Sequence, residues 1–417
     1  MAPVMGTPHR RSPAVSPALT YYSRFYFQET LLVFFFAALL GSGWRYAKRR
    51  SLGGALAAGV SAGLMAATKE TSLILFAGLA AAFGMLSLVE SIRTRTRGVV
   101  TAGDAWVWRD TRTKIPTLFH SALFLAAAAA TAALFYTSFF QNPHGLADSV
   151  RAIGASFVRA GHPGVHAHPW NYYFQILAYS KTAGGPVWSE AFLLFLAAAG
   201  GIAALGHDAG RDGSPRFLRF ILFFTIVTAA AYSLIPYKTP WNMLPFYLGL
   251  VILAGNGVAL LLRISRFKLV KILVLTVLVP GFADLALQNR RASIERPADP
   301  ANPYVYAQTS PDFLRLVEAV ERAASAAQEK KDLLIKVIAP PDETWPLPWY
   351  LRGYGRVGYW TSPGAAQAFT GAGEAAVVIA SAAFAEEVGA ALGDGYDQAF
   401  YGLRPEVILS LFTRRPR

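Results

Sequence analysis

Long apolar runs separated by short polar segments are the main pattern of the chain. A helix that spans a membrane needs about 20 mostly apolar residues. The pattern predicts eight such spans, at 30–46, 52–67, 71–89, 117–138, 187–206, 217–235, 241–262 and 269–287. One helix over 52–89 would be about 57 Å long, well beyond a hydrocarbon core of about 30 Å, so the chain is expected to fold back at the "TKET" segment.

The pattern changes after about residue 290, where the segments become shorter and more polar. Ser310 is a predicted N-cap and Pro311 the first helical residue, and apolar positions such as Phe313, Val317 and Val320 follow at helical spacing. "DLLIKVIAP", "EAAVVIASAA" and "PEVILSLFTRR" read as strands, and "FAEEVGAALG" reads as a helix. These segments together predict a small α/β domain.

The predicted fold class is therefore an α-helical polytopic membrane protein, with about eight transmembrane helices and a small C-terminal α/β domain. We divide the chain into an N-terminal segment at 1–29, a transmembrane domain at 30–289 and an α/β domain at 290–417.

Composition supports a membrane protein over a soluble one. The chain is 54% hydrophobic and only 15% charged, whereas soluble domains carry about 25% charged residues. Its net charge of +14 does not favour a nucleic-acid partner, because the cations lie in short segments between the apolar runs. The chain has no cysteine, which excludes disulfides, thiolate nucleophiles and cysteine metal sites.

The cations are distributed unequally between the two sets of connecting segments. One set holds 17 Lys or Arg residues, at 44–51, 91–116, 207–219 and 263–271, and the other holds five, at 68–71, 139–186 and 236–240. Because cytoplasmic loops carry the excess of Lys and Arg, the first set is expected in the cytoplasm. We thus expect a multi-pass protein of the inner (plasma) membrane whose C-terminal domain is extracytoplasmic.

Five charged residues lie at helix ends or in short turns on the expected extracytoplasmic side, namely Arg24, Glu29, Lys69, Glu70 and Lys238. The cations could reach individually to the headgroups, or they could gather round an anionic lipid phosphate. A carboxylate and cations beside lipid suit transfer of a sugar from a polyprenyl phosphate. The carboxylate would accept the proton of the acceptor hydroxyl, and the cations would neutralise the departing phosphate. Alternatively, Lys69 and Glu70 neutralise each other within their turn.

The long segment 139–186 contains "GHPGVHAHPWNYYFQILAYSK". Its histidines, His162, His166 and His168, could ligate a divalent metal, but their spacing is not specific to one. The cofactor therefore stays unknown, with a divalent metal as one option. The aromatic residues of "PWNYYFQIL" suit headgroup depth or stacking on a sugar ring, and the sequence does not separate these two roles.

Five segments in order resemble the polytopic glycosyltransferases of the GT-C superfamily: "SPALTYYSRFYFQETLLVFF", "ATKETS", "HPWNYYFQIL", "PYKTPWN" and "WPLPWYLR". They are most similar to the bacterial and archaeal branch that is related to dolichyl-phosphate-mannose protein mannosyltransferases and is sometimes described as flippase-associated. The resemblance covers most of the chain. It implies a membrane enzyme that moves a sugar from a polyprenyl-phosphate donor to an acceptor on the extracytoplasmic face.

The resemblance also assigns roles to the five charged residues. Arg24 and Glu29 match the family's Ser-Arg pair followed by an acid, Lys69 and Glu70 match its Lys-Glu turn, and Lys238 matches its Tyr-Lys-Thr-Pro-Trp turn. The implied catalytic residues are Glu29 and Glu70. The implied ligands of the lipid phosphate are Arg24, Lys69 and Lys238.

The sequence departs from the family pattern at its start. Family members carry two or three further helices upstream, and a first outer loop with the acid taken to be the catalytic base, whereas residues 1–22 contain no Asp or Glu. We therefore expect the chain to lack the family's N-terminal part and its main catalytic carboxylate. The alternative hypothesis is a non-catalytic lipid-binding or flippase-associated subunit. A transporter is less favoured, because the spans carry few charges at mid-depth.

Overall fold

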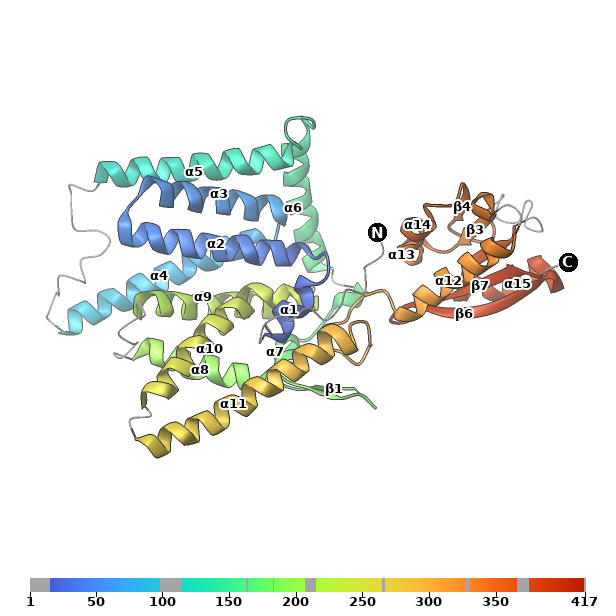
Figure 1. Ribbon diagram of the computed structural model, residues 1–417. Helices are drawn as coiled ribbons and strands as arrows, with labels where there is room; N and C mark the ends of the chain where they lie inside the picture. The colour runs from blue at the N-terminus through green and yellow to red at the C-terminus, as the bar shows by residue number, and fades with distance from the viewer. Residues whose placement is uncertain are drawn as a thin grey trace. The chain divides into compact units, whose positions relative to one another are not determined.

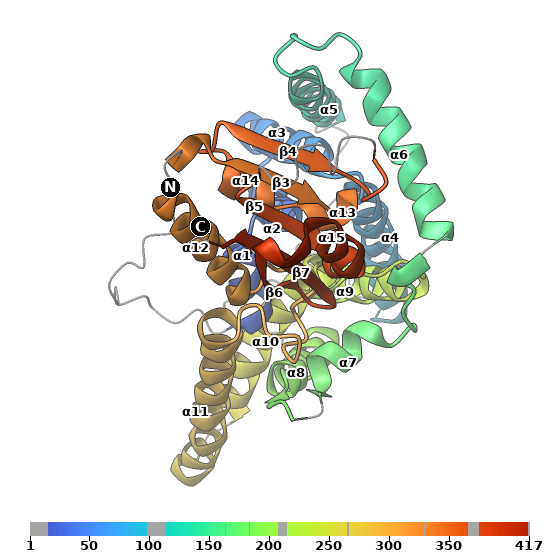
Figure 2. The same ribbon diagram turned by 90° about the vertical axis from the view of Figure 1, so that its right-hand side faces the viewer.

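The computed structural model describes residues 16–97, 114–162, 164–182, 184–206, 215–264, 267–327, 330–365 and 375–415. The chain divides into two units, Met1–Glu295 and Arg296–Arg417. Figures 1 and 2 show that the first unit is a set of long helices and that the second is built on a sheet.

The first unit contains the longest helices of the described chain. In order they are α1 (Pro17–Ser23), α2 (Gln28–Arg49), α3 (Leu52–Thr68), α4 (Ser72–Arg97), α5 (Lys114–Tyr136), α6 (Gly145–Gly161), α7 (Tyr172–Ala178), α8 (Ala191–Leu205), α9 (Pro215–Leu234), α10 (Leu244–Ile264) and α11 (Lys268–Arg290). Short helical turns are η2 (Gly164–His166), η3 (Pro240–Met243) and η4 (Arg291–Glu295).

Six helical segments in the described residues are long and apolar enough to cross a membrane: Gln28–Arg49, Ser72–Arg93, Leu118–Tyr136, Pro215–Leu234, Pro240–Ile264 and Lys268–Glu295. Two shorter apolar helices, α3 and α8, accompany them. The prediction of a polytopic, mostly helical membrane protein is confirmed at this level. The fold-back at "TKET" is also present, since α3 and α4 are separate helices.

The predicted span 187–206 is wrong at its start. Strand β2 (Val187–Trp188) pairs antiparallel with β1 (Ser180–Lys181), and the helix begins only at Ala191. The apolar residues Val187 and Trp188 extended the hydropathy signal, but their backbone groups are used in a strand pair instead of a helix.

Close helix packing depends on small residues. Gly200 of α8 and Gly257 of α10 face each other, and a Cβ on Gly200 would lie 1.8 Å from the carbonyl oxygen of Leu253. A Cβ on Gly257 would lie 2.1 Å from the carbonyl oxygen of Leu196, so neither position admits a side chain without moving the backbone. Small residues of this kind let membrane helices approach closely.

The second unit is a five-stranded mixed sheet with a helix on each face. Its elements are α12 (Pro311–Ala326), β3 (Leu334–Ile338), α13 (Pro341–Thr344), α14 (Leu347–Leu351), β4 (Arg356–Trp360), β5 (Val377–Ser381), α15 (Ala385–Leu392), β6 (Tyr396–Arg404) and β7 (Val407–Arg414). The strand order is β4-β3-β5-β7-β6, in which β3 runs parallel to β4 and β5 while β7 runs antiparallel to β5 and β6.

The two faces of this sheet are covered by helices. Phe313, Leu316 and Val320 of α12 pack on one face, and Val388 of α15 packs on the other. The predicted Ser310 cap is confirmed, because its hydroxyl accepts from the Asp312 amide.

Candidate functional site

Glu29 and Lys69 form an ion pair in the first unit, in which Glu29 is buried and Lys69 is partly exposed. Glu29 lies in the first turn of α2, where the helix dipole favours a negative charge. Lys69 is the C-cap of α3, and its extended backbone ends that helix. The Glu29 residue is 3% exposed. The end of the helices at which this pair lies also includes α1, α6, α7 and η3. We call this end the site end (Figure 1).

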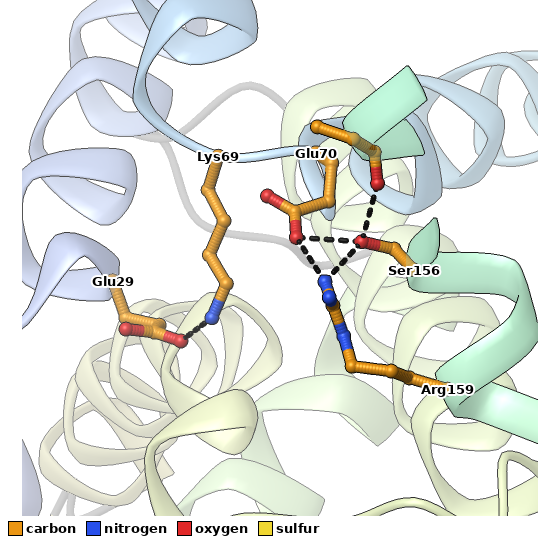
Figure 3. A network of polar contacts seen from close by, with 6 residues as sticks. Glu29, Lys69, Glu70, Ser156 and Arg159 are labelled. Carbon is orange, nitrogen blue, oxygen red and sulfur yellow. Dashed lines mark hydrogen bonds and ion pairs between the residues drawn. The ribbon is translucent and has the colours of Figure 1, made fainter. Parts of the chain in front are cut away.

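Glu70 follows Lys69 directly but is bound on the other side of the turn. Its Oε1 accepts from the Ser156 hydroxyl at 2.6 Å and from the Arg159 guanidinium at 3.0 Å, both on α6. Figure 3 shows Lys69 directed toward α2 and Glu70 directed toward α6. The turn between α3 and α4 thus binds two separate helices, because Lys69 pairs with Glu29 of α2 and Glu70 binds α6.

The environment of Glu70 keeps it ionised. Partial burial acts to raise its pKa, but the Ser156 hydrogen bond, a backbone hydrogen bond and the charges of Lys69 and Arg159 together hold the pKa below its usual range. A carboxylate with a lowered pKa is a weak general base near neutral pH. Glu70 is therefore better suited to orienting groups than to accepting a proton.

Aromatic side chains from four elements surround the Glu29 end of this network. Tyr22 of α1 contacts Phe27 and Trp241 edge-on, and Phe27 stacks on Trp241 with ring centroids 4.6 Å apart. Tyr173 of α7 is buried next to the Asn242 side chain. Burial raises the pKa of both Tyr22 and Tyr173, and the charge of Glu29 adds to the shift, so both phenols remain neutral hydrogen-bond donors.

Several hydroxyls near these elements are buried without a partner. Within the described residues, the side-chain oxygens of Thr20, Ser233 and Thr239 meet no hydrogen-bond partner. They lie on α1, at the end of α9 and in the turn before η3, respectively. Since buried polar groups are normally paired, unpaired hydroxyls at one end of the helices indicate a region that accommodates water or a polar ligand.

Lys238 lies inside the protein, although its position in a short turn suggested an exposed tip. The residue is 1% exposed, and its Nζ donates to the carbonyl oxygens of His168 at 3.0 Å and Ile235 at 2.6 Å. Its backbone amide donates to the His166 carbonyl at 3.0 Å. Burial lowers the pKa of Lys238, and no carboxylate among the described residues pairs with it. The result is a buried cation whose ammonium is bound by backbone carbonyls in the described part of the chain.

Arg24 occupies the C-cap of α1 and is exposed. It forms no ion pair in the described part of the chain, because Glu29, its nearest acid in sequence, is bound to Lys69. The alternative interpretation proposed that Lys69 and Glu70 neutralise each other within their turn. The two side chains do not form an ion pair with each other, although the charge of Lys69 lowers the pKa of Glu70. The structure therefore brings Glu29, Lys69 and Glu70 into one network, leaves Arg24 at the surface and buries Lys238.

The histidines of the long segment lie against separate aromatic rings. His166 packs against Tyr237 with ring centroids 4.8 Å apart, and His168 stacks on Tyr172 at 4.1 Å. Burial and the charge of Lys238 lower the pKa of His168. Across the described ranges, no group of three His, Cys, Asp or Glu side chains is arranged to hold a metal ion.

Sequence reasoning missed the partners that complete this network. Ser156 and Arg159 lie in a 48-residue connecting segment, 139–186, that gave no predicted helix. The available signal was the periodic pattern of apolar and charged residues over 145–161, which is typical of an amphipathic helix. No family model, curated protein or solved structure matches the sequence.

Proposed function

We propose that the chain is a GT-C-type membrane glycosyltransferase, which transfers a sugar from a polyprenyl-phosphate donor to an acceptor on the extracytoplasmic face. The observation that carries this proposal is the buried Lys238 ammonium, which pairs with no carboxylate among the described residues and lies at the same end of the helices as the Glu29–Lys69 pair. A buried positive charge at this end of the helices favours the approach of an anionic headgroup.

In this proposal the donor phosphate and the acceptor hydroxyl bind different residues of the site end. The exposed guanidinium of Arg24 and the ammonium of Lys69 bind the phosphate, with Lys238 contributing charge from beneath. Glu29 orients or deprotonates the acceptor hydroxyl, and Glu70 fixes the turn that carries Lys69.

Binding in nanodiscs tests the phosphate assignment. A polyprenyl-phosphate sugar should bind the wild-type chain, and Arg24→Ala and Lys238→Ala should each weaken binding by about tenfold, the effect of one charge-assisted hydrogen bond. Lys271→Ala, an exposed cation of α11, serves as the matched control and should bind as the wild type does. Unchanged binding in both site variants would overturn the proposal.

The second candidate is a non-catalytic lipid-binding or flippase-associated subunit. Its support is that Glu29 and Glu70 are both held in ion pairs, and that the lowered pKa of Glu70 makes it a weak base. The two functions differ in one measurement. Transfer of labelled sugar to an acceptor, lost in Glu29→Gln, supports the enzyme, whereas binding without any transfer supports the subunit.

The proposal includes the membrane arrangement, with eight spans in the plasma membrane when α3 and α8 are counted and with the second unit extracytoplasmic. The absence of native cysteine allows single-cysteine labelling. A membrane-impermeant reagent applied to intact cells should label Thr182→Cys and Ser325→Cys but not Arg45→Cys, all three being exposed positions. The reverse pattern would place the site end in the cytoplasm and would contradict the proposal.

A further inference from the structure

Helix α6 crosses the site end of the helices instead of running beside them (Figures 1 and 2). A tight corner after α5 sets this course. Ser138, Phe139 and Phe140 all have positive φ, at 49°, 58° and 68°, which non-glycine residues rarely adopt. At the end of the corner, a Cβ on Gly145 would lie 1.8 Å from the Tyr136 carbonyl oxygen, so only glycine permits so close an approach.

The other end of α6 is held by Glu70. Ser156 and Arg159 both bind its Oε1, as Figure 3 shows. The corner and this network fix the position and the rotation of the helix. Its remaining surface is largely exposed, although α6 contains many apolar residues.

The exposed surface of α6 is amphipathic. At 3.6 residues per turn, four of its apolar residues, Leu146, Val150, Ile153 and Phe157, fall within about 60° of the helical wheel, while Val158 lies outside this arc. Val150 is 68% exposed and Phe157 is 70% exposed. The charged residues Asp148, Arg151 and Arg159 lie on a different face. We call Leu146, Val150, Ile153 and Phe157 the apolar stripe.

Lipid is the occupant that the surroundings of the stripe favour. The span that precedes α6 exposes Leu118, Leu125 and Phe135, which contact lipid if this helix crosses the bilayer. Phe139 and Phe140 at the corner are 60% and 77% exposed and continue this surface to Leu146. An exposed apolar surface that continues from a membrane span onto a helix crossing the span's end lies at the depth of the lipid headgroups.

We propose that α6 is an interfacial helix, whose apolar stripe inserts into the bilayer surface at the site end while the Glu70 network fixes its rotation. The helix is about 25 Å long at about 1.5 Å per residue, so it would cover a substantial strip of lipid beside the site. This proposal depends on the membrane spans and does not depend on any enzymatic activity.

Spin labels on single cysteines test the proposal in nanodiscs made of the full chain and phospholipid. Labels at Val150→Cys and Phe157→Cys should be more accessible to oxygen than to a water-soluble nickel reagent. Labels at Arg151→Cys and Ala155→Cys, on the opposite side of the helix, should show the reverse. All four side chains are exposed, so the substitutions remove little packing, and the native chain has no competing thiol.

Three results would overturn the proposal. If the four labels were equally accessible to the nickel reagent, the stripe would lie in water. Strong dipolar broadening between labels at position 150 would assign the stripe to a second copy of the chain. As an independent measurement on the unmodified chain, a lipid with a photoreactive group at headgroup depth should crosslink to the stripe, and the lack of any crosslink there would equally contradict the proposal.

Discussion

Glu29 at the start of α2 and Lys69 at the end of α3 form an ion pair across 40 residues of sequence. A helical hairpin brings them together, since α2 and α3 run in opposite directions and pack side by side. The cost of burying each charge is offset only while both are present. The pair therefore links the geometry of the hairpin to the charge at the candidate site.

Removing one member of this pair should be more harmful than removing both. Lys69→Met leaves the buried Glu29 carboxylate without its partner and should cost about 3 kcal/mol of stability, whereas Glu29→Gln leaves the partly exposed Lys69 ammonium and should cost less. The double variant should recover part of that loss, seen as a higher melting temperature in detergent than either single variant has.

The exposed Arg151–Asp148 pair of α6 provides the matched control. Arg151→Gln should cost less than about 1 kcal/mol, because solvent screens exposed pairs. Equal effects at Lys69 and Arg151 would show that burial of the Glu29–Lys69 pair contributes nothing.

Stability should fall in acid because of Glu70. Its pKa in the folded protein lies below the ordinary value of 4.5, so the folded state favours the ionised form. The resulting stabilisation is complete above pH 4.5 and is lost as the pH falls through the lower folded pKa. The melting temperatures of the wild type and of Glu70→Gln should differ at pH 6 and converge in stronger acid. A difference that stays constant down to pH 3 would contradict this assignment.

Lys238 should stabilise the contact between two segments that are far apart in the sequence. Its Nζ and backbone amide bind the carbonyls of His168 and His166, while Ala167 and Tyr237 form an antiparallel bridge. Lys238→Met leaves the two carbonyl acceptors of Nζ unpaired. Hydrogen exchange at residues 166–172 and 235–238 should then become faster, whereas Lys271→Met should leave it unchanged. Equal exchange in both variants would show that the lysine is not needed for this contact.

The positions of the long helices could be predicted because lipid imposes a length and a composition on them. The expected 30–46 corresponds to Gln28–Arg49, and the expected 71–89 corresponds to Ser72–Arg97. In the second unit, β3, β5, β7, α12 and α15 were all expected from their apolar patterns. Strands β4 and β6 were missed, since "RVGYW" and "YDQAFYGLR" place glycine and polar residues where a buried strand would be apolar.

The site could be predicted only in part. The sequence located charged residues at the helix ends, because such residues stand out against apolar neighbours. Their partners depend on which helices pack together, and so Lys69 binds Glu29 and not the adjacent Glu70. The burial of Lys238 was also not apparent, since it results from the segment around His168 folding over a turn 70 residues away.

Two glycines of α10 offer a test of how closely α8 and α10 pack. Gly257 faces Leu196 of α8, whereas a Cβ on Gly255, on the same helix, would meet nothing within 4 Å. Gly257→Ala must push α8 and α10 apart and should cost about 1 to 3 kcal/mol, as overpacking does in other cores. Gly255→Ala should be neutral or stabilise by up to about 1 kcal/mol, because alanine favours a helix more than glycine does. Melting temperatures in detergent distinguish the two variants, and equal values would mean that α8 and α10 do not pack as closely as the structure shows.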